Sequence, residues 1–325
     1  MRQAAPRGIL DRIGPVSPSQ PAGPQTTVVV CTLNRRASVL VTLASLAGQD
    51  TRSFSVLVVD NGGQDGTPEA VAELARTFPV TLQSVVEKRP GASAARNRAL
   101  QERDDDLLIF LDDDVTCSTG LVSAYQRTFA NPRVDAAGGR IVIALPDDAD
   151  ELLVNHAPLS YGGPWAAYDL GPATRATGGD VPMPFGGNMA IRAPLLRAIG
   201  GFRDDIGYGT SGLPGEDTAL FRKLETDRKH VLYVADATVV HRFQREKMTR
   251  EYFLGWYRSQ GRSAALMARG DRSRVRRAWS VIEESLKLAR YGAKRALTRD
   301  ARKRFALACK LERARGKLAG MVQST

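Results

Sequence analysis

The chain has 325 residues, a formal net charge of +11 at pH 7, and 43% hydrophobic and 25% charged residues. These proportions are typical of globular proteins and exclude a largely disordered chain. No apolar run approaches the roughly 20 residues that a membrane-spanning helix needs, and the three widely spaced cysteines, Cys31, Cys117 and Cys309, fit neither a disulfide framework nor a zinc site.

The charge is concentrated at one end of the chain. Residues 271–325 contain 16 basic and 5 acidic side chains, whereas residues 1–270 contain equal numbers of the two kinds. A nucleic-acid-binding protein would carry basic residues on the working face of its main body. Since the main body here is neutral, we expect no nucleic-acid partner.

Strands and helices alternate after a proline-rich leader at residues 1–25, which we expect to be disordered. Compact β-rich runs and helical spacings follow in turn. The strands are expected at 28–32, 54–60, 80–86 and 107–111, and the helices at 37–48, from 67, and at 93–103. Such alternation predicts an α/β fold with a parallel, doubly wound sheet, which binds ligands at the carboxyl ends of its strands.

Polar residues follow the ends of these strands. Thr32-Leu33-Asn34-Arg35 follows the first strand, Asp60 ends the second, and Asp112-Asp113-Asp114 follows the fourth. The chain has no GxGxxG dinucleotide fingerprint after its first strand and no GxxxxGK[ST] phosphate loop. We therefore expect a nucleotide cleft of neither common kind.

The second half of the chain has a looser pattern. Residues 158–184, rich in glycine and proline, are predicted to form a long ordered loop, and residues 203–215 a flexible segment. Strands are expected at 185–192, 231–235 and 238–241, and helices at 194–199 and 216–227. From residue 249 onward, apolar residues recur at helical spacing opposite a basic face, which indicates a C-terminal basic helical extension.

Asp112, Asp113 and Asp114 form the strongest candidate site. If strand geometry persists, Asp112 and Asp114 point the same way. Carboxylates gathered in this manner suit a hard cation such as Mg²⁺ or Mn²⁺, which could clamp a diphosphate. The same residues are also typical of a solvated turn that caps the next helix.

Three further segments have both a structural and a functional interpretation. Asp60-Asn61-Gly62-Gly63 is a turn sequence, or it aims a carboxylate at a nucleobase or ribose. The segment from Arg89 to Asn97 is an ordinary helix start with a basic surface face, or it offers cationic groups and helix N–H groups to an anion. Glu216-Asp217 is either a helix-dipole partner or a general base on a mobile loop. His241 becomes functional only if the fold brings it to Asp114.

Taken in order, these motifs resemble the GT-A-fold, family-2 glycosyltransferases. The resemblance spans roughly residues 26–245; its segments are Thr32-Leu33-Asn34-Arg35, Val58-Val59-Asp60-Asn61-Gly62, Pro90-Gly91 with Ala95-Arg96-Asn97, Phe110-Leu111-Asp112-Asp113-Asp114, Gly186-Gly187-Asn188 with Gly200-Gly201-Phe202, and Gly215-Glu216-Asp217. It implies a Rossmann-like, mostly parallel sheet flanked by helices. The nucleotide-sugar half would occupy residues 26–115 and the acceptor half residues 116–248, with the helical extension at 249–325.

The resemblance also implies roles for individual residues. Asp217 is expected to be the general base, and Asp114, Asp112 and His241 to hold the divalent cation. Contacts with the donor nucleotide are expected from Thr32, Asn34, Arg35, Asp60, Arg89, Arg96, Asp112 and Asp113. The sugar or acceptor pocket is expected to be lined by Asn188, Glu216 and Trp165. Leu33 departs from the family, which often has an aromatic ring there, and the QxxRW pattern of processive synthases is absent, so single-sugar transfer is expected.

The resemblance thus implies metal-dependent, inverting transfer of a sugar from a nucleoside diphosphate sugar to a hydroxyl acceptor. Two alternatives stay open: a sugar nucleotidyltransferase of similar architecture, disfavoured because residues 32–37 lack glycine, and a non-catalytic basic adaptor. Residues 271–325 could lie on an anionic membrane, which would suit a lipid-linked acceptor, or pair in a homodimer. With no secretory signal in the sequence, the expected location is the cytoplasm, including the inner face of the cell membrane.

Overall fold

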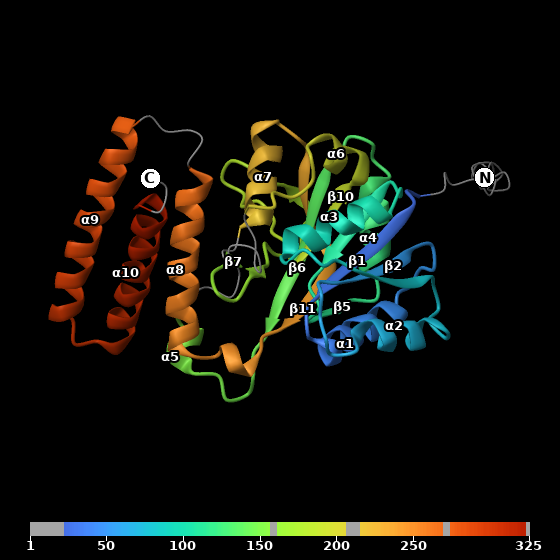
Figure 1. Ribbon diagram of the computed structural model, residues 1–325, viewed down its shortest axis with the longest axis horizontal. Helices are drawn as coiled ribbons and strands as arrows, with labels where there is room; N and C mark the ends of the chain where they lie inside the picture. The colour runs from blue at the N-terminus through green and yellow to red at the C-terminus, as the bar shows by residue number, and fades with distance from the viewer. Residues whose placement is uncertain (1–22, 157–160, 206–214, 269–273, 323–325) are drawn as a thin grey trace, which may run out of the picture.

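A mixed β-sheet with helices on both faces organises most of the chain (Figure 1). The computed structural model describes residues 23–156, 161–205, 215–268 and 274–322. Most of the expected leader at 1–25 and of the expected flexible segment at 203–215 lies outside these residues. The strand order in the sheet is β3-β2-β1-β4-β10-β6-β11-β5.

The first half is the alternating part that the sequence predicts. Its elements are β1 (Thr26–Thr32), α1 (Arg36–Ala47), β2 (Ser55–Asp60), α2 (Thr67–Ala75), β3 (Leu82–Val86), α3 (Ala92–Glu102) and β4 (Leu107–Leu111). The four strands are parallel, with β1 between β2 and β4. The strand order therefore reverses at β1, and a crevice opens at the carboxyl ends of such neighbouring strands.

The second half turns the sheet antiparallel at β10. Its elements are β5 (Val115–Cys117), α4 (Leu121–Phe129), β6 (Ala136–Ala144), α5 (Glu151–Val154), β7 (Tyr161–Gly162), β8 (Ala167–Tyr168), β9 (Arg175–Ala176), β10 (Asn188–Arg192), α6 (Ala193–Ala198), α7 (Glu216–Thr226) and β11 (Val231–Arg242). The two strands expected at 231–241 are one strand, β11, with an irregularity between Val234 and Val239. The loop expected at 158–184 contains three two-residue strands in its described part.

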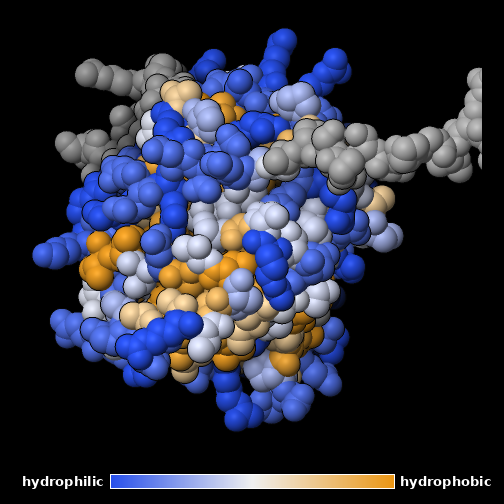
Figure 2. Space-filling view, turned by 90° about the vertical axis from the view of Figure 1, so that its right-hand side faces the viewer, coloured by the Kyte–Doolittle hydropathy of each residue, from blue (hydrophilic) through white to orange (hydrophobic). Residues whose placement is uncertain are grey.

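Alternate side chains of a strand pack into two separate cores, one on each face of the sheet. Val28 and Val30 of β1 pack with α1, α2 and α4 on one face of the sheet, whereas Val29 packs with α3, α6 and α7 on the other. This division follows from the two-residue period of a strand. Figure 2 views the end of the molecule that carries α1 and α2, where apolar residues form a band between hydrophilic borders.

The C-terminal extension is packed against this α/β body. It comprises a short 3-10 turn, η1 (Arg245–Lys247), and the helices α8 (Arg250–Met267), α9 (Arg274–Leu297) and α10 (Ala301–Val322). Phe253 of α8 and Phe305 of α10 share a third core with Trp165. None of the helices in the described part of the chain has the length and apolar character needed to cross a bilayer.

Candidate active site

The ends of three strands bring several expected donor residues to one edge of the sheet. Thr32 ends β1 and lies opposite Asp60, which ends β2, and Asp112 follows β4. Asn34 has a φ of 52° and turns the chain after β1. Its Oδ1 accepts a hydrogen bond of 2.8 Å from the Gln64 amide, which ties the loop after β1 to the loop after β2.

Asp60 is buried within the turn that follows it. Its Oδ2 accepts a hydrogen bond of 3.1 Å from the Gly63 amide, and burial raises the pKa of the carboxyl group. A Cβ on Gly63 would lie 2.7 Å from Asp60 Oδ1, so the turn requires glycine. Asn61 then joins this turn to the next loop, because its side chain accepts from the Gly91 amide and donates to the Arg89 carbonyl, both at 2.7 Å.

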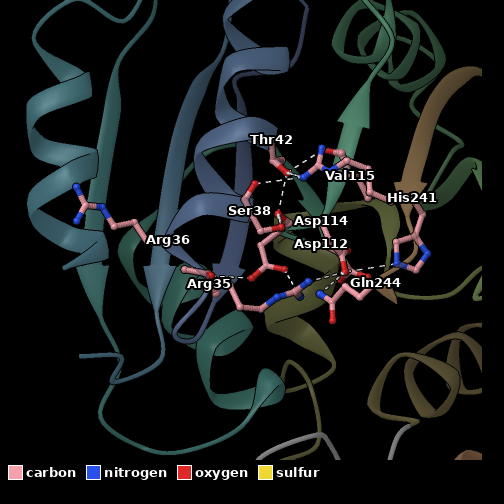
Figure 3. Close-up of polar contacts among 12 residues, drawn as sticks. Arg35, Arg36, Ser38, Thr42, Asp112, Asp114, Val115, His241 and Gln244 are labelled. Carbon is pink, nitrogen blue, oxygen red and sulfur yellow. Dashed lines mark hydrogen bonds and ion pairs between the residues drawn. The ribbon is translucent and has the colours of Figure 1, made fainter. Parts of the chain in front are cut away.

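Asp113 points into the protein. Its carboxylate accepts a hydrogen bond of 2.6 Å from the Thr32 hydroxyl and pairs with Arg35. Its carbonyl accepts hydrogen bonds of 2.9 Å from the hydroxyls of Ser38 and Thr42 (Figure 3). Burial raises the pKa of Asp113 to about 6. Asp113 thus joins the turn after β4 to β1 and α1, and its expected donor contact stays a prediction.

Asp114 faces His241, as Figure 3 shows. Because β11 pairs with β5, His241 lies opposite Val115, the residue after Asp114. His241 Nε2 is 3.4 Å from Asp114 Oδ2, which also accepts a hydrogen bond of 2.8 Å from Arg35 Nη2. Asp114 Oδ1 is buried and has no hydrogen-bond partner. The fold thus brings His241 to Asp114, and its expected role as a metal ligand stays a prediction.

The Asp114–His241 pair determines the charge of this part of the site. Burial opposes the ionised carboxylate, but the hydrogen bond and charge of His241, together with Arg35, lower the pKa of Asp114 to about 2. Burial likewise opposes a charged imidazole, and Asp114 outweighs it and raises the pKa of His241. His241 Nδ1 lies 3.1 Å from the Trp165 carbonyl oxygen, which fixes the orientation of the ring.

The Trp165 side chain lies in the protein core. Its ring is completely buried, with ring-centroid distances of 4.9 Å to both Phe243 and Phe253. This burial corrects the expectation that Trp165 lines the acceptor pocket. The sequence marked an aromatic residue in a glycine-rich segment, but the C-terminal helices cover it, and only its carbonyl group reaches the site.

Asp112 and Asp217 approach the same short piece of backbone before β10. A Cβ on Gly187 would lie 3.1 Å from Asp112 Oδ2, and a Cβ on Gly186 would lie 3.0 Å from Asp217 Oδ2. The Gly186 amide donates a hydrogen bond of 2.6 Å to Asp217 Oδ2. Because the two glycines have no side chains, they leave room for one carboxylate from the end of β4 and one from the start of α7.

Arg96 and Glu216 form a buried ion pair between these carboxylates. Arg96 Nη1 lies 2.5 Å from Glu216 Oε1, and Arg96 Nη2 lies 3.9 Å from Asp112 Oδ1. Desolvation and the charge of Asp217 raise the pKa of Glu216. Desolvation and the charge of Asp114 do the same for Asp112. The positive charge of Arg96 offsets part of this concentration of acidic groups.

Two other expected site residues are engaged elsewhere. Asn188 is fully buried, accepts a hydrogen bond of 2.8 Å from the Tyr125 hydroxyl and donates one of 2.8 Å to the Ala237 carbonyl. The Arg89 side chain pairs with Glu87 at 3.2 Å and with Asp204 at 3.6 Å. These contacts make Asn188 a support beneath the site and place Arg89 at its exposed rim.

The structure adds three residues that the motifs did not mark individually. Gln244 Nε2 lies 3.5 Å from Asp114 Oδ2. Tyr252 of α8 is close enough that burial and the Asp114 charge raise its pKa to about 12. Lys247 lies over the Tyr252 ring, and its charge contributes to the lowered pKa of Asp114.

The donor atoms near Asp114 match part of what a divalent cation needs. The described residues contain no ready-made group of three or more His, Cys, Asp or Glu side chains arranged around a metal. Asp114 Oδ1 is nevertheless an unsatisfied buried carboxylate oxygen, and the imidazole of His241 lies 3.4 Å from the other oxygen, Oδ2. Carboxylate oxygen and imidazole nitrogen are ligands that Mn²⁺ accepts.

Residues 27–200 match the family model described as Glycosyl transferase family 2. The match covers more than half of the chain and includes β1 to β10 with the Asp112–Asp114 turn. The chain belongs to glycosyl transferase family 2. Asp217 and His241 lie beyond the matched segment, and their expected roles stay predictions.

Two curated relatives are also glycosyltransferases by name. The uncharacterized glycosyltransferase YfnE of Bacillus subtilis is 31% identical over 108 residues, which are 33% of this chain and 27% of the relative. The glycosyltransferase AglE of Haloferax volcanii is 26% identical over 126 residues, which are 38% of this chain and 41% of the relative. The matches thus span less than half the length of either relative.

Solved structures confirm the GT-A fold expected for a family-2 chain. The mannosyltransferase PcManGT of Pyrobaculum calidifontis, in complex with GDP-Man and Mn²⁺, has a TM-score of 0.59 at 20% identity, covering 91% of this chain and 87% of that one. S. aureus TarS 1–349, in complex with UDP-GlcNAc, has a TM-score of 0.54 at 18% identity, covering 78% and 69%. At these identities the likeness concerns the fold.

Proposed function

We propose that this family-2 chain transfers one sugar residue from a nucleoside diphosphate sugar to a hydroxyl group of an acceptor, with inversion at the anomeric carbon. One observation carries the proposal: Asp112 and Asp217 meet at Gly186-Gly187, with Arg96 between Asp112 and Glu216. A carboxylate at the donor edge of the sheet thereby faces a second carboxylate at the start of α7.

The donor nucleotide is proposed to lie over the ends of β1, β2 and β4. Asp60 and Asn34 stand at the turns there, and the first turn of α3 presents backbone N–H groups that suit a diphosphate. Similar solved folds hold GDP-Man or UDP-GlcNAc, which supports a nucleoside diphosphate sugar as donor. Which nucleotide and which sugar are bound depends on contacts within this crevice.

A divalent cation is proposed to bind at Asp114, with His241 and Asp112 as the neighbouring ligands. The unsatisfied Asp114 Oδ1 is the feature that favours it. When bound, such a cation neutralises charge on the diphosphate. Arg35 and Lys247 supply fixed positive charge on the same side of the site.

Asp217 is proposed as the general base. Its Oδ2 is held by the Gly186 amide and its Oδ1 by the Thr218 amide at 2.5 Å, so the carboxylate has one orientation. The acceptor hydroxyl gives its proton to Asp217 as its oxygen forms a bond to the anomeric carbon. The bond from that carbon to the diphosphate oxygen breaks on the opposite side, which inverts the configuration.

The test is Asp217→Asn in the full chain, with Asp227→Asn at the other end of α7 as the matched control. General-base assistance contributes about 10²–10⁴ in rate, so release of nucleoside diphosphate from the donor should fall at least about a hundredfold. Thermal stabilisation by the donor should persist, because Asp217 lies at the start of α7 and not among the strand ends that are proposed to hold the donor nucleotide. The control should retain turnover.

The same thermal-shift assay tests the cation, by comparing a panel of nucleoside diphosphate sugars with Mn²⁺ and with EDTA. Stabilisation by one donor only when Mn²⁺ is present is the expected result. Near-normal turnover of Asp217→Asn would overturn the base assignment, and equal stabilisation under both conditions would overturn the cation.

A further inference from the structure

Helix α9 presents an apolar face to solvent. Trp279 and Leu286 are each 66% exposed, Ile282 is 49% exposed and Leu297 is 85% exposed. Exposed alanines continue the spacing of three or four residues, so that the stripe consists of Trp279, Ile282, Leu286, Ala289, Ala293 and Leu297. These residues lie along one side of the helix for about 27 Å. We call them the α9 stripe.

The inward face of α9 includes buried polar residues as well as half-buried apolar ones such as Tyr291. Glu284 is 4% exposed and its carboxylate pairs with Lys287 and with Lys317 of α10. Ser280, one turn earlier on this face, is also buried. Helices of a globular protein normally turn their apolar side inward. Packing against α10 therefore does not explain the α9 stripe.

Several apolar residues of α10 are buried, unlike those of the α9 stripe. Phe305, Ala308 and Leu311 are only 6–7% exposed, and Phe305 packs with Phe253 of α8. The apolar residues that recur at helical spacing through the basic extension therefore belong to two different surfaces. The α10 surface is buried within the protein, whereas the α9 stripe is left without a partner in the described part of the chain.

Positive charge borders the stripe. Arg276, Arg290 and Lys294 are exposed on α9 beside it. At the C-terminal end of α9, a pocket against α10 is lined by Lys294, Leu297, Thr298, Lys303, Ala306, Leu307 and Lys310. The pocket combines three lysines with apolar side chains, which suits a phosphate group attached to a hydrocarbon chain. The Thr298 hydroxyl donates a hydrogen bond of 2.7 Å to the Lys294 carbonyl, and Lys310 Nζ lies 5.9 Å from the Tyr291 ring centroid.

We propose that α9 lies on an anionic lipid bilayer, with the α9 stripe inserted among the headgroups and the lysine pocket holding a lipid phosphate. A tryptophan at the start of the stripe suits the membrane interface. In Figure 1, α9 is the outermost helix, with α10 and α8 between it and the sheet, so a flat surface can reach it.

Charge favours a bilayer over a second copy of the chain. The segment that forms α9 contains seven basic and two acidic residues, and one of the acids, Glu284, is buried in its pairs with Lys287 and Lys317. Two such helices packed stripe to stripe would bring like charges together, whereas anionic headgroups attract them.

The test is sedimentation of the full chain with vesicles of phosphatidylcholine alone and of phosphatidylcholine with an equal share of phosphatidylglycerol. Preferential pelleting with the second kind is expected. Leu286→Glu should lower the partition coefficient about tenfold or more, and Lys303→Gln with Lys310→Gln about fivefold for each lysine. Val41→Glu, at a 49% exposed residue of α1, is the matched control and should bind as the unaltered chain does.

Each other outcome overturns the proposal. Equal pelleting with both vesicle types removes the role of anionic lipid, and normal pelleting of Leu286→Glu removes the role of the stripe. Analytical ultracentrifugation provides the remaining outcome: a dimer that Leu286→Glu converts to a monomer, without vesicle binding, assigns the stripe to a second copy. Sedimentation needs neither donor nor acceptor, so its failure is separate from failure of the proposed glycosyl transfer.

Discussion

Arg96 and Asp217 approach the Gly186 backbone more closely than a side chain at that position would allow. A Cβ there would lie 2.8 Å from Arg96 Nη2 and 3.0 Å from Asp217 Oδ2. Both distances are shorter than ordinary contacts between a methyl group and a polar atom. The absence of a side chain at Gly186 therefore sets the positions of the proposed base and of the arginine that pairs with Glu216.

We predict that Gly186→Ala lowers kcat by about tenfold to a hundredfold, because a displacement of about 1 Å in the base is enough for such a loss. Donor binding should change less than kcat, since only the β4 side of the proposed donor crevice, where Arg96 approaches Asp112, adjoins Gly186. Steady-state kinetics and donor-induced thermal shifts check the two expectations. Gly255→Ala in α8, where a Cβ would meet nothing within 4 Å, is the control and should remain fully active.

Kinetics in which Gly186→Ala turns over at the normal rate would show that Asp217 tolerates movement and is not the base. Loss of donor binding with an unchanged kcat would place Gly186 in the donor site. The two results separate a positioning effect from general disruption of the fold.

At the residue scale, the sequence indicated which groups have useful chemistry but not where each side chain points. The structure brings Asp114 and His241 together as anticipated, because β5 and β11 pair at that point. It takes Trp165 and Asn188 into the interior instead. Their burial depends on partners such as Phe253 and Tyr125, which are distant in the chain and cannot be read from local spacing.

At the scale of elements, α8 and α10 pack closely against each other at two glycines. A Cβ on Gly261 would overlap the Arg313 carbonyl oxygen, and a Cβ on Gly316 would overlap the Arg258 carbonyl oxygen. The two helix backbones therefore touch directly. This close approach places Phe305 and Cys309 of α10 in the core that also contains Trp165.

We predict that Gly316→Ala separates the two helices at a cost of about 1–3 kcal/mol, the usual range for an overpacked contact. Cys309 reports the change, because it is a free thiol, 1% exposed, whose pKa burial raises to about 12. A thiol reagent should label Cys309 faster in the variant, with the site identified by mass spectrometry, and the melting temperature should fall.

Gly292→Ala is the control for this experiment, because a Cβ there would have no neighbour within 4 Å. Its Cys309 should react as slowly as in the unaltered chain. If Gly316→Ala also leaves the labelling rate and the melting temperature unchanged, the α8–α10 packing described here is wrong.

Element-scale prediction succeeded where strands and helices alternate and failed where they do not. The pattern located β1 to β4 and their helices, since a buried strand and an amphipathic helix have different periods. It did not mark β5, α4 or β6. It also treated α9 and α10 alike, because spacing predicts a helix with an apolar face without saying what covers that face.

At the scale of the whole molecule, helix α8 contacts both sides of the proposed site. Tyr252 of α8 is near Asp114. At the other end of α8, a Cβ on Gly215 would lie 2.7 Å from Met267 Cε, immediately before the start of α7. Helix α8 therefore spans from the proposed cation site to the helix that carries Asp217, whereas α9 packs on α10.

We predict from this arrangement that donor and Mn²⁺ together slow hydrogen exchange in α8 as well as in the β4–β5 turn and the first turn of α7, while leaving α9 unchanged. A ligand at a hundred times its Kd stabilises the form that binds it by about 2.7 kcal/mol, so protected amides should exchange up to about a hundredfold more slowly. Exchange measured by mass spectrometry with donor and EDTA is the control, and α9 is the internal reference.

Protection confined to the strand ends, with α8 unaffected, would mean that the extension is only attached to the catalytic body. Equal protection of α9 would mean that donor binding stabilises the whole molecule uniformly. The expected result, protection of α8 without protection of α9, would identify α8 as part of the donor-responsive site and α9 as a separate surface.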